Sequence, residues 1–332
     1  MKEPGGVRRT VAQWKLRTRT LELGRRTLVM GVVNITPDSF SDGGLFLDPE
    51  AAVARSMQLL DEGADLLDLG AESTRPGARA GSSLTEGDGP GSALAVSAEE
   101  EQARLLPALE GILKVRPEAI VSVDTYKAST ARAALAAGAE IVNDVSGFLW
   151  DSGLAAVCAE AGCGVVLTHT RGRPDEWGAQ AQLPADALLA TVISGLQSRL
   201  AYASSAGIAA ESIVLDPGYG FGKRGGENFA LLARQADLLA LGRPLMAGVS
   251  RKSFLGHALA PLYAGKAAPV EARETASLAG LVAAILHGAS VVRVHRVRAA
   301  VEAALVADAL RIQIAEDRSQ GETRSEQHPD ES

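Results

Sequence analysis

The apolar runs of this sequence repeatedly end in polar residues whose types suit the recognition of a flat ring that carries an anion. These residues are Asn34, Asp124, Asn143, His169, Asp216, Lys252, Arg293 and His295. Two carboxylates and an amide offer acceptors for the N–H groups of a heterocycle, and Lys252 matches an acceptor atom of the ring. Arg75, Arg293 and His295 supply the positive charge and the donors that a phosphate or diphosphate needs. The set therefore predicts a ring-binding site with an anion site beside it.

Each of these residues also has a plainer interpretation, because Asp and Asn just after a strand commonly cap the following helix. Caps do not account for the whole set, since the apolar run is interrupted at the same point each time. Asp124 and Asp216 lie far apart in the sequence. Only a closed barrel, in which all strand ends meet at one rim, brings them together.

The elements that must position these residues alternate regularly along the chain. Short apolar runs predict buried parallel strands at residues 28–34, 65–70, 119–124, 140–143, 164–169, 213–216, 245–249 and 291–295. Helices are predicted near residues 50–62, 98–115, 127–137, 152–161, 185–206, 227–240, 253–260, 272–287 and 298–314. Glycines suited to helix C-caps precede four of the strands, at Gly63, Gly138, Gly162 and Gly288. Eight β–α units of this kind predict an α/β fold, a (β/α)8 barrel, with an open doubly wound sheet as the alternative.

The segments outside these units are assigned from composition. We expect residues 1–14 to form a flexible N-terminal arm and residues 15–315 to form a single domain. Within it, residues 15–28 alternate around Gly24-Arg25 in a way typical of a β-hairpin. The Gly/Ser-rich stretch 79–95 predicts a mobile insertion, and the polar stretch 316–332 a disordered tail.

The totals limit the class of protein. A chain of 332 residues with 46% hydrophobic residues can bury one large core. The formal charge of −7 argues against general binding to nucleic acid or to a membrane surface, and no apolar run reaches the length of a membrane span. Cys158 and Cys163 are expected to be reduced core residues, which favours the cytoplasm.

Three loops after predicted strands could carry function. The segment after Asn34 is rich in Pro, Asp, Ser and Gly, which is typical of a mobile active-site loop. Residues 248–253 open a helix whose backbone N–H groups, with Ser253, are expected to hold an anion such as a carboxylate; a plain serine cap is the alternative. Residues 218–223 are glycine-rich but fit neither the P-loop nor the dinucleotide fingerprint, and Phe221 is expected there to stack on a ring or to cover the barrel mouth.

Taken together, these segments resemble the dihydropteroate synthases. The matching motifs follow in family order as NITPDSFSDGG (34–44), DLGAESTRPG (68–77), SVDT (122–125), ND (143–144), DPG (216–218), SRKS (250–253) and RVH (293–295). The resemblance implies a (β/α)8 barrel, commonly a homodimer. It also implies an enzyme that joins p-aminobenzoate to the diphosphate ester of hydroxymethyl-dihydropterin in folate synthesis and releases diphosphate.

The resemblance further implies roles for individual residues. The pterin would be held by Asp124, Asn143, Asp216, Phe221 and Lys252. The diphosphate would be held by Asn34, Thr74, Arg75, Arg293 and His295, with Mg2+ on Asn34. The p-aminobenzoate would be held by Phe40, Pro76, Lys252 and Ser253. Catalysis would rest on Asp38, Asn34, Lys252, Arg293 and His295, through an SN1-like substitution in which Asp38 stabilises a cationic methylene group.

This chain departs from the family pattern at three places. Thr168 stands where the family usually has a methionine that packs on the pterin, and Arg296 stands where it usually has aspartate. The stretch 79–95 is longer than the usual link by about fifteen residues. Two other functions therefore stay open, a pterin methyltransferase of the corrinoid type and a paralogue that binds pterin without turning it over. The Thr-Pro-Asp-Ser-Phe loop and the Ser-Arg-Lys-Ser element argue against the methyltransferase, which needs neither.

Overall fold

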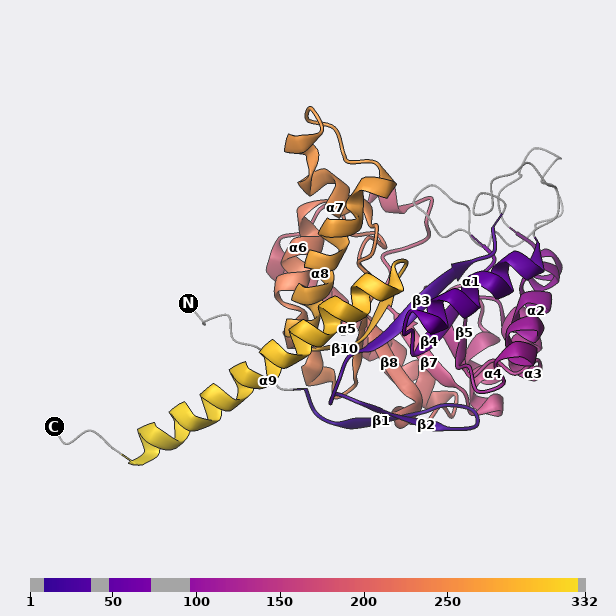
Figure 1. The fold of residues 1–332 in the computed structure, drawn as a ribbon, viewed down its shortest axis with the longest axis horizontal. Helices are drawn as coiled ribbons and strands as arrows, with labels where there is room; N and C mark the ends of the chain where they lie inside the picture. The colour runs from indigo at the N-terminus through magenta and orange to yellow at the C-terminus, as the bar shows by residue number, and fades with distance from the viewer. Residues whose placement is uncertain (1–8, 37–47, 73–95, 328–332) are drawn as a thin grey trace.

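The computed structural model describes residues 9–36, 48–72 and 96–327, which form a closed barrel of eight parallel strands with helices outside it (Figure 1). The strands are β3 (Leu28–Asn34), β4 (Leu66–Gly70), β5 (Val121–Asp124), β6 (Ile141–Asp144), β7 (Gly164–Thr168), β8 (Ile213–Asp216), β9 (Leu245–Ala247) and β10 (Ala289–Val294). The barrel closes where β10 pairs with β3, with Arg293 opposite Met30. The predicted (β/α)8 barrel is confirmed, and the open sheet is excluded.

Helices follow the strands and cover the outside of the barrel. Those in the described ranges are α1 (Pro49–Asp61), α2 (Ala98–Val115), α3 (Ala128–Ala136), α4 (Leu154–Ala161), α5 (Ala185–Ser205), α6 (Gly226–Ala233), α7 (Ser253–Ala258), α8 (Glu274–Leu286) and α9 (Val297–Gln327). The helix predicted at 227–240 is divided, because Arg234 leaves helical dihedral angles (φ −113°, ψ 13°) and a 3-10 helix, Gln235–Leu241, follows.

A hairpin closes the base of the barrel, at the N-terminal ends of the strands. It consists of β1 (Ala12–Lys15) and β2 (Thr20–Leu23), which pair antiparallel and lie beneath the barrel, at the opposite end from α7 (Figure 1). Trp14, Leu16 and Leu23 pack there on a buried apolar layer formed by Leu28, Met30, Leu66, Ile141, Val166, Val214, Met246 and Val291. The Trp14 indole N–H donates to the Ser212 carbonyl at 2.9 Å, which satisfies its one polar atom.

The hairpin is real but its turn was misplaced. The chain reverses between Leu16 and Arg19, where the Leu16 N–H donates to the Arg19 carbonyl at 2.8 Å. Gly24 lies after β2, with φ at +98°, and a Cβ there would lie 2.5 Å from the Thr10 carbonyl oxygen. The glycine is therefore needed for the close passage of Thr10, and it does not form the hairpin turn.

The predicted flexible arm is wrong for residues 9–14. Arg9 is only 5% exposed. Its guanidinium contacts Asp308 on α9 at 3.3 Å and donates to the Thr27 hydroxyl at 3.0 Å. Because a buried arginine needs partners of this kind, it ties the N-terminal segment to the last helix. Residues 1–8 lie outside the described residues.

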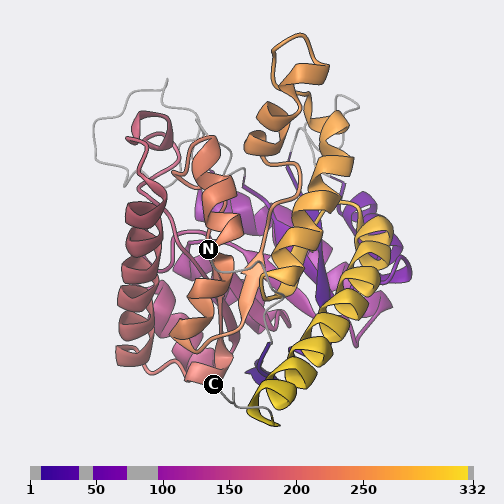
Figure 2. The same ribbon diagram turned by 90° about the vertical axis from the view of Figure 1, so that its left-hand side faces the viewer.

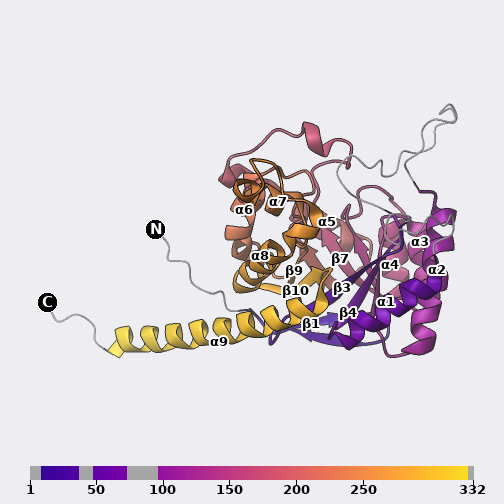
Figure 3. The ribbon, with the colours of Figure 1, turned by 45° about the horizontal axis from the view of Figure 1, so that its top comes forward.

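The last helix is longer than the sequence pattern predicted. α9 continues to Gln327, so residues 316–327 are helical where a disordered tail was expected. This part needs no apolar face, because it projects from the body of the molecule (Figure 3). Side-chain pairs such as Gln313 Nε2 to Asp317 Oδ1 (2.9 Å) support an exposed helix. Figure 2 shows the earlier part of α9, in yellow, along the outside of the barrel next to α8, in orange. The stretch 79–95 and residues 328–332 lie outside the described residues.

Two further expectations concern the state of the cysteines and membrane-spanning segments. Cys158 and Cys163 are both buried and both free, as predicted. Among the described residues, no helix combines the length and the apolar character that a membrane span requires.

Candidate active site

The C-terminal ends of the strands bring most of the predicted polar residues to one mouth. His169 is an exception, because its imidazole lies against Gly195 of α5, on the outer side of the barrel. In the strand register, Asn34 lies opposite Gly70, which lies opposite Asp124. Asp124 in turn lies opposite Asn143. Farther round the barrel, Thr168 lies opposite Asp216. These residues do not cap the following helices, since the N-cap of α3 is Lys127 and the N-cap of α6 is Gly225. The predicted convergence is therefore confirmed, and the capping interpretation is wrong for Asp124 and Asp216.

Arg293 reaches from β10 across the mouth and bonds to residues of two other strands, β4 and β5. Its Nη2 donates to Asp124 Oδ2 at 2.7 Å, and its Nε donates to Asp68 Oδ2 at 2.5 Å. The same Asp68 oxygen accepts from Asn143 Nδ2 at 3.0 Å. Asp68 was missed as a site residue, although its sequence carries a signal: it is a lone charge inside the apolar run of β4.

Burial sets the protonation of this cluster. It raises the pKa of Asp124 to about 7, while the neighbouring Arg293 opposes that rise and Asp68 adds to it. The Asp68 and Asp124 carboxylates more than offset the burial of Arg293 and raise its pKa above its ordinary value. The guanidinium is therefore a permanent cation, and Asp124 is a carboxylate that can lose or gain its proton near neutrality.

A second group lies on β8 and in the loops after β8 and β9. Asp216 Oδ1 accepts from the Gly218 N–H at 2.6 Å, and burial raises the pKa of this carboxyl group. Lys252 Nζ lies 3.6 Å from the centre of the Phe221 ring. Burial lowers the pKa of Lys252 to about 8, and the Asp216 charge opposes that shift. Phe221 therefore contacts the lysine of the site, and its ring also packs on Trp177, with centroids 5.0 Å apart.

The glycine-rich loop at 218–223 is held by a lysine that the sequence analysis did not single out. Lys223 is 4% exposed, and its Nζ donates to the carbonyls of His169 (2.7 Å) and Gly218 (2.9 Å). Gly218 has φ at +70°, and a Cβ on it would lie 1.9 Å from the His169 carbonyl oxygen. The glycine and the lysine together fix the loop that carries Phe221 against the end of β7.

The Ser-Arg-Lys-Ser element is fixed by its second residue. Arg251 has φ at +59°, which is unusual for a non-glycine residue. Its N–H donates to Ser277 Oγ at 2.9 Å, its Nε donates to Glu274 Oε1 at 2.6 Å, and its carbonyl accepts from Arg273 Nη1 at 3.0 Å. These bonds hold the turn that presents Lys252.

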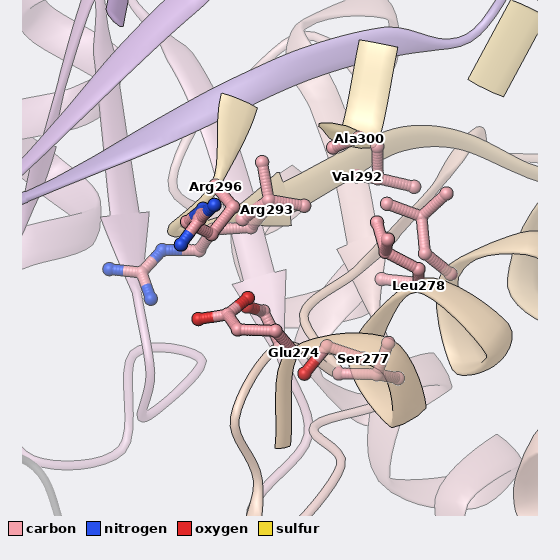
Figure 4. Close-up of a pocket in the computed structure, with 12 residues that line it drawn as sticks. Glu274, Ser277, Leu278, Val292, Arg293, Arg296 and Ala300 are labelled. Atoms are coloured by element: carbon pink, nitrogen blue, oxygen red, sulfur yellow. The ribbon is translucent and has the colours of Figure 1, made fainter. Parts of the chain in front are cut away.

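A small cavity lies beside this turn, on the outer side of the barrel wall. Figure 4 shows Glu274 and Ser277 at one side of it, with Val292, Leu278 and Ala300 at another, while the Arg293 side chain extends away from it. Ser250 also lines this cavity, and its hydroxyl lies 2.9 Å from His295 Nδ1. This pair orients the imidazole at the rim of the barrel.

Of the remaining predicted site residues, some lie in the described ranges and others lie outside them. Ser253 is exposed and is the first residue of α7. Asn34 is half-buried at the end of β3. Thr168 is buried at the end of β7. Asp38, Phe40, Thr74, Arg75 and Pro76 lie outside the described residues.

The described residues at the mouth fit a Mg2+ ion that is shared with a substrate. Among the described residues, no cluster of three or more His, Cys, Asp or Glu side chains could hold a metal. Mg2+ in phosphate-transferring sites commonly takes one or two protein oxygens and completes its shell with phosphate oxygens and water. The amide oxygen of Asn34 can serve as one such ligand.

Known proteins are similar to this chain in both sequence and fold. A family model described as "Pterin binding enzyme" matches residues 30–295. The dihydropteroate synthase of Mycobacterium leprae is 42% identical over 281 residues, which are 85% of this chain and 92% of that protein. The mitochondrial folate synthesis bifunctional protein of Pisum sativum is 38% identical over 302 residues, and the match covers 87% of this chain and 54% of that longer protein. A solved structure of Xanthomonas albilineans dihydropteroate synthase with 4-aminobenzoic acid has a TM-score of 0.76 at 38% identity, covering 91% of this chain and 98% of that chain.

A parallel barrel with carboxylates, an amide, a lysine and an arginine at its mouth agrees with the family match, which places the chain among the pterin-binding enzymes. The two relatives that align over nearly their whole length, from M. leprae and X. albilineans, are both dihydropteroate synthases. The chain belongs to the dihydropteroate synthase family.

Proposed function

We propose that this protein joins p-aminobenzoate to (7,8-dihydropterin-6-yl)methyl diphosphate, giving dihydropteroate and diphosphate for folate synthesis. The observation that carries the proposal is the convergence of Asp124, Asn143 and Asp216 with Lys252 at the barrel mouth. The X. albilineans relative, whose structure contains 4-aminobenzoic acid, supports the second substrate.

The ring is held by complementary hydrogen bonds. Asp124, Asn143 and Asp216 accept from N–H groups of the pterin, and Lys252 donates to an acceptor atom of the ring. Lys252 can also contact the aminobenzoate, because it leads directly into α7, where Ser253 and the helix start would receive the carboxylate. Phe40 and Pro76 would complete that site by resemblance to the family.

The leaving diphosphate needs charge neutralisation. His295, with Nδ1 at Ser250, can turn Nε2 toward an anion, and Arg293 supplies a permanent cation. Thr74 and Arg75 would add donors by resemblance to the family. Mg2+ held by Asn34 and the diphosphate would neutralise further charge on the leaving group.

The substitution is proposed to be SN1-like. Once its charge is neutralised, diphosphate is a good leaving group, and the pterin ring can stabilise the methylene cation. Asp38 would stabilise that cation until the aniline nitrogen attacks. Because a protonated aniline is acidic, the reaction needs no strong general base.

The deciding assay follows diphosphate release from the pterin diphosphate with Mg2+, with and without p-aminobenzoate. Release that depends on p-aminobenzoate supports the synthase. Pterin binding without release would instead support the paralogue that binds but does not react. An assembly as homodimer and a cytoplasmic location are part of the same proposal, and sedimentation of the purified protein tests the first.

A further inference from the structure

Asp68 is a buried carboxylate on β4 that bridges two residues of the mouth. It is the middle residue of β4 and is 0% exposed. Its Oδ2 accepts two hydrogen bonds, from Arg293 Nε and from Asn143 Nδ2. Its Oδ1 has no partner among the described residues. Asn143 belongs to the proposed pterin site and Arg293 to the diphosphate site beside it, so Asp68 joins the two sites from beneath.

The contact with Asn143 decides which way the amide faces. An ionised carboxylate only accepts hydrogen bonds, so the amide must turn its NH2 group toward Asp68. The Asn143 carbonyl oxygen is then left for the mouth. The mouth therefore presents three acceptors, from Asp124, Asn143 and Asp216, and no amide donor.

The contact with Arg293 fixes the guanidinium at two points. Nε is bonded to Asp68 and Nη2 to Asp124, on adjacent strands. The guanidinium plane is therefore set before a ligand arrives, and one amino group stays available for a ligand. Fixing a group in its binding orientation reduces the entropy that binding would otherwise cost.

We propose that Asp68 is a positioning residue that holds Asn143 as an acceptor and Arg293 in a fixed plane, so that the mouth selects a ring edge made of N–H donors. The inference rests on the proposed function, because it specifies how the pterin site recognises its ring. Asp68 itself does not contact the ring in this arrangement.

The first test compares the affinity for pteroate, measured by calorimetry, in three variants. Asp68→Ala removes both hydrogen bonds and should weaken pteroate by about 30-fold. Asp68→Asn keeps one oxygen that can accept both bonds and should stay within about 5-fold of the parent. Ser122→Ala is the matched control, since Ser122 lies opposite Asp68 in the register, is equally buried and has an unpartnered hydroxyl.

The second test exchanges the two side chains and uses isosteric variants that should fold even if Asp68→Ala does not. Asn143→Asp alone places two carboxylates against each other and should weaken pteroate by about 30-fold. In the double variant Asp68→Asn with Asn143→Asp, the new amide at 68 can donate to the new carboxylate at 143. The mouth keeps its acceptor, and the affinity should return to within about 5-fold of the parent.

The outcomes separate the two proposals. If the double variant is no better than Asn143→Asp, or if Asp68→Ala behaves like Ser122→Ala, the positioning role is wrong. If the parent protein itself does not bind pteroate, the proposed function fails instead. A KM for the pterin diphosphate that rises in Asp68→Ala while the KM for p-aminobenzoate stays constant supports the positioning role, whereas a general loss of structure would raise both.

Discussion

The two ends of the barrel are built from the same eight strands, but the base is filled by apolar side chains and the mouth by polar and charged ones. At the base, inward residues such as Met30 and Val166 are apolar, and the hairpin covers them with Trp14. At the mouth the inward residues are polar: Asp68, Asn143 and Asp216 each lie two residues beyond a residue of the base layer, namely Leu66, Ile141 and Val214. Because side chains alternate along a strand, a single strand can serve the core at one end and the site at the other.

This difference separates stability from function. Apolar burial at the base stabilises the fold in proportion to the area removed from water. Buried ion pairs at the mouth, such as Arg293 with Asp124, recover in hydrogen bonds roughly what their desolvation costs. Variants at the base should therefore change the free energy of unfolding, and variants at the mouth should change ligand affinity.

The largest expected effect is at the base. Trp14→Ala removes a fully buried indole and its hydrogen bond to Ser212, and should lower the free energy of unfolding by about 3–5 kcal/mol. Denaturant unfolding measures this. The pteroate affinity of the folded fraction should be unchanged. If affinity fell as much as in a variant at the mouth, the base would not act on stability alone.

A variant at the boundary of the two regions should show both effects. Lys223→Met leaves the His169 and Gly218 carbonyls without their donor, and should cost about 2 kcal/mol of unfolding free energy. Because the loop with Phe221 is then less well fixed, the KM for the pterin diphosphate should also rise. Thermal unfolding and steady-state kinetics on one sample measure the stability and the KM. A change in stability alone would mean that Lys223 serves only the fold, and a change in KM alone would mean that it serves only the site.

At the mouth alone, Asp216→Asn should act on affinity. The substitution replaces a charged acceptor by a neutral one and should weaken pteroate by about 10–30-fold. The free energy of unfolding should fall by no more than about 0.5 kcal/mol, since an isolated buried charge is itself costly. Calorimetric titration and denaturant unfolding measure the two quantities. A stability loss as large as that of Trp14→Ala would contradict the comparison.

The protonation of the mouth predicts a bell-shaped dependence of pteroate affinity on pH. Asp124 must be ionised to accept, and its raised pKa of about 7 means that affinity falls as the pH drops below that value. Lys252 must be protonated to donate, and its lowered pKa of about 8 means that affinity falls as the pH rises above it. Each limb should approach about tenfold per pH unit. Affinity that is flat between pH 6 and pH 9 would show that neither group titrates in the free protein.

The smallest effect is expected beyond the base, in the projecting part of α9. Arg311 anchors α9 near the base, where it donates to the carbonyls of Gly24 and Arg25 at 3.2 Å and 3.0 Å. Ending the chain after Ile314 removes only residues beyond this anchor. The free energy of unfolding should change by less than about 0.5 kcal/mol, with no change in activity. A larger loss would mean that residues after Ile314 also stabilise the fold.

The sequence predicted the strand ends well, because buried parallel strands are continuous apolar runs and a polar residue marks their end. β3 and β8 have the predicted bounds, and Asp124, Asn143 and Asp216 lie where the pattern placed them. The failures come from contacts that the local pattern does not show. The hairpin turn was assigned to Gly24, whose conformation is needed for the close passage of Thr10. Arg9 was assigned to a flexible arm because its partner Asp308 lies 299 residues away in the sequence.

The sequence by itself therefore determined the order of the strands, the apolar runs that bury them and the types of side chain at their ends, since these follow from local composition and period. Only the tertiary structure decided that Asp68 bridges Arg293 and Asn143, that Lys223 fixes the loop after β8 and that Arg251 turns Lys252 into the mouth. These contacts join residues far apart in the chain, and the geometry that brings them within hydrogen-bond distance exists only once the barrel has closed.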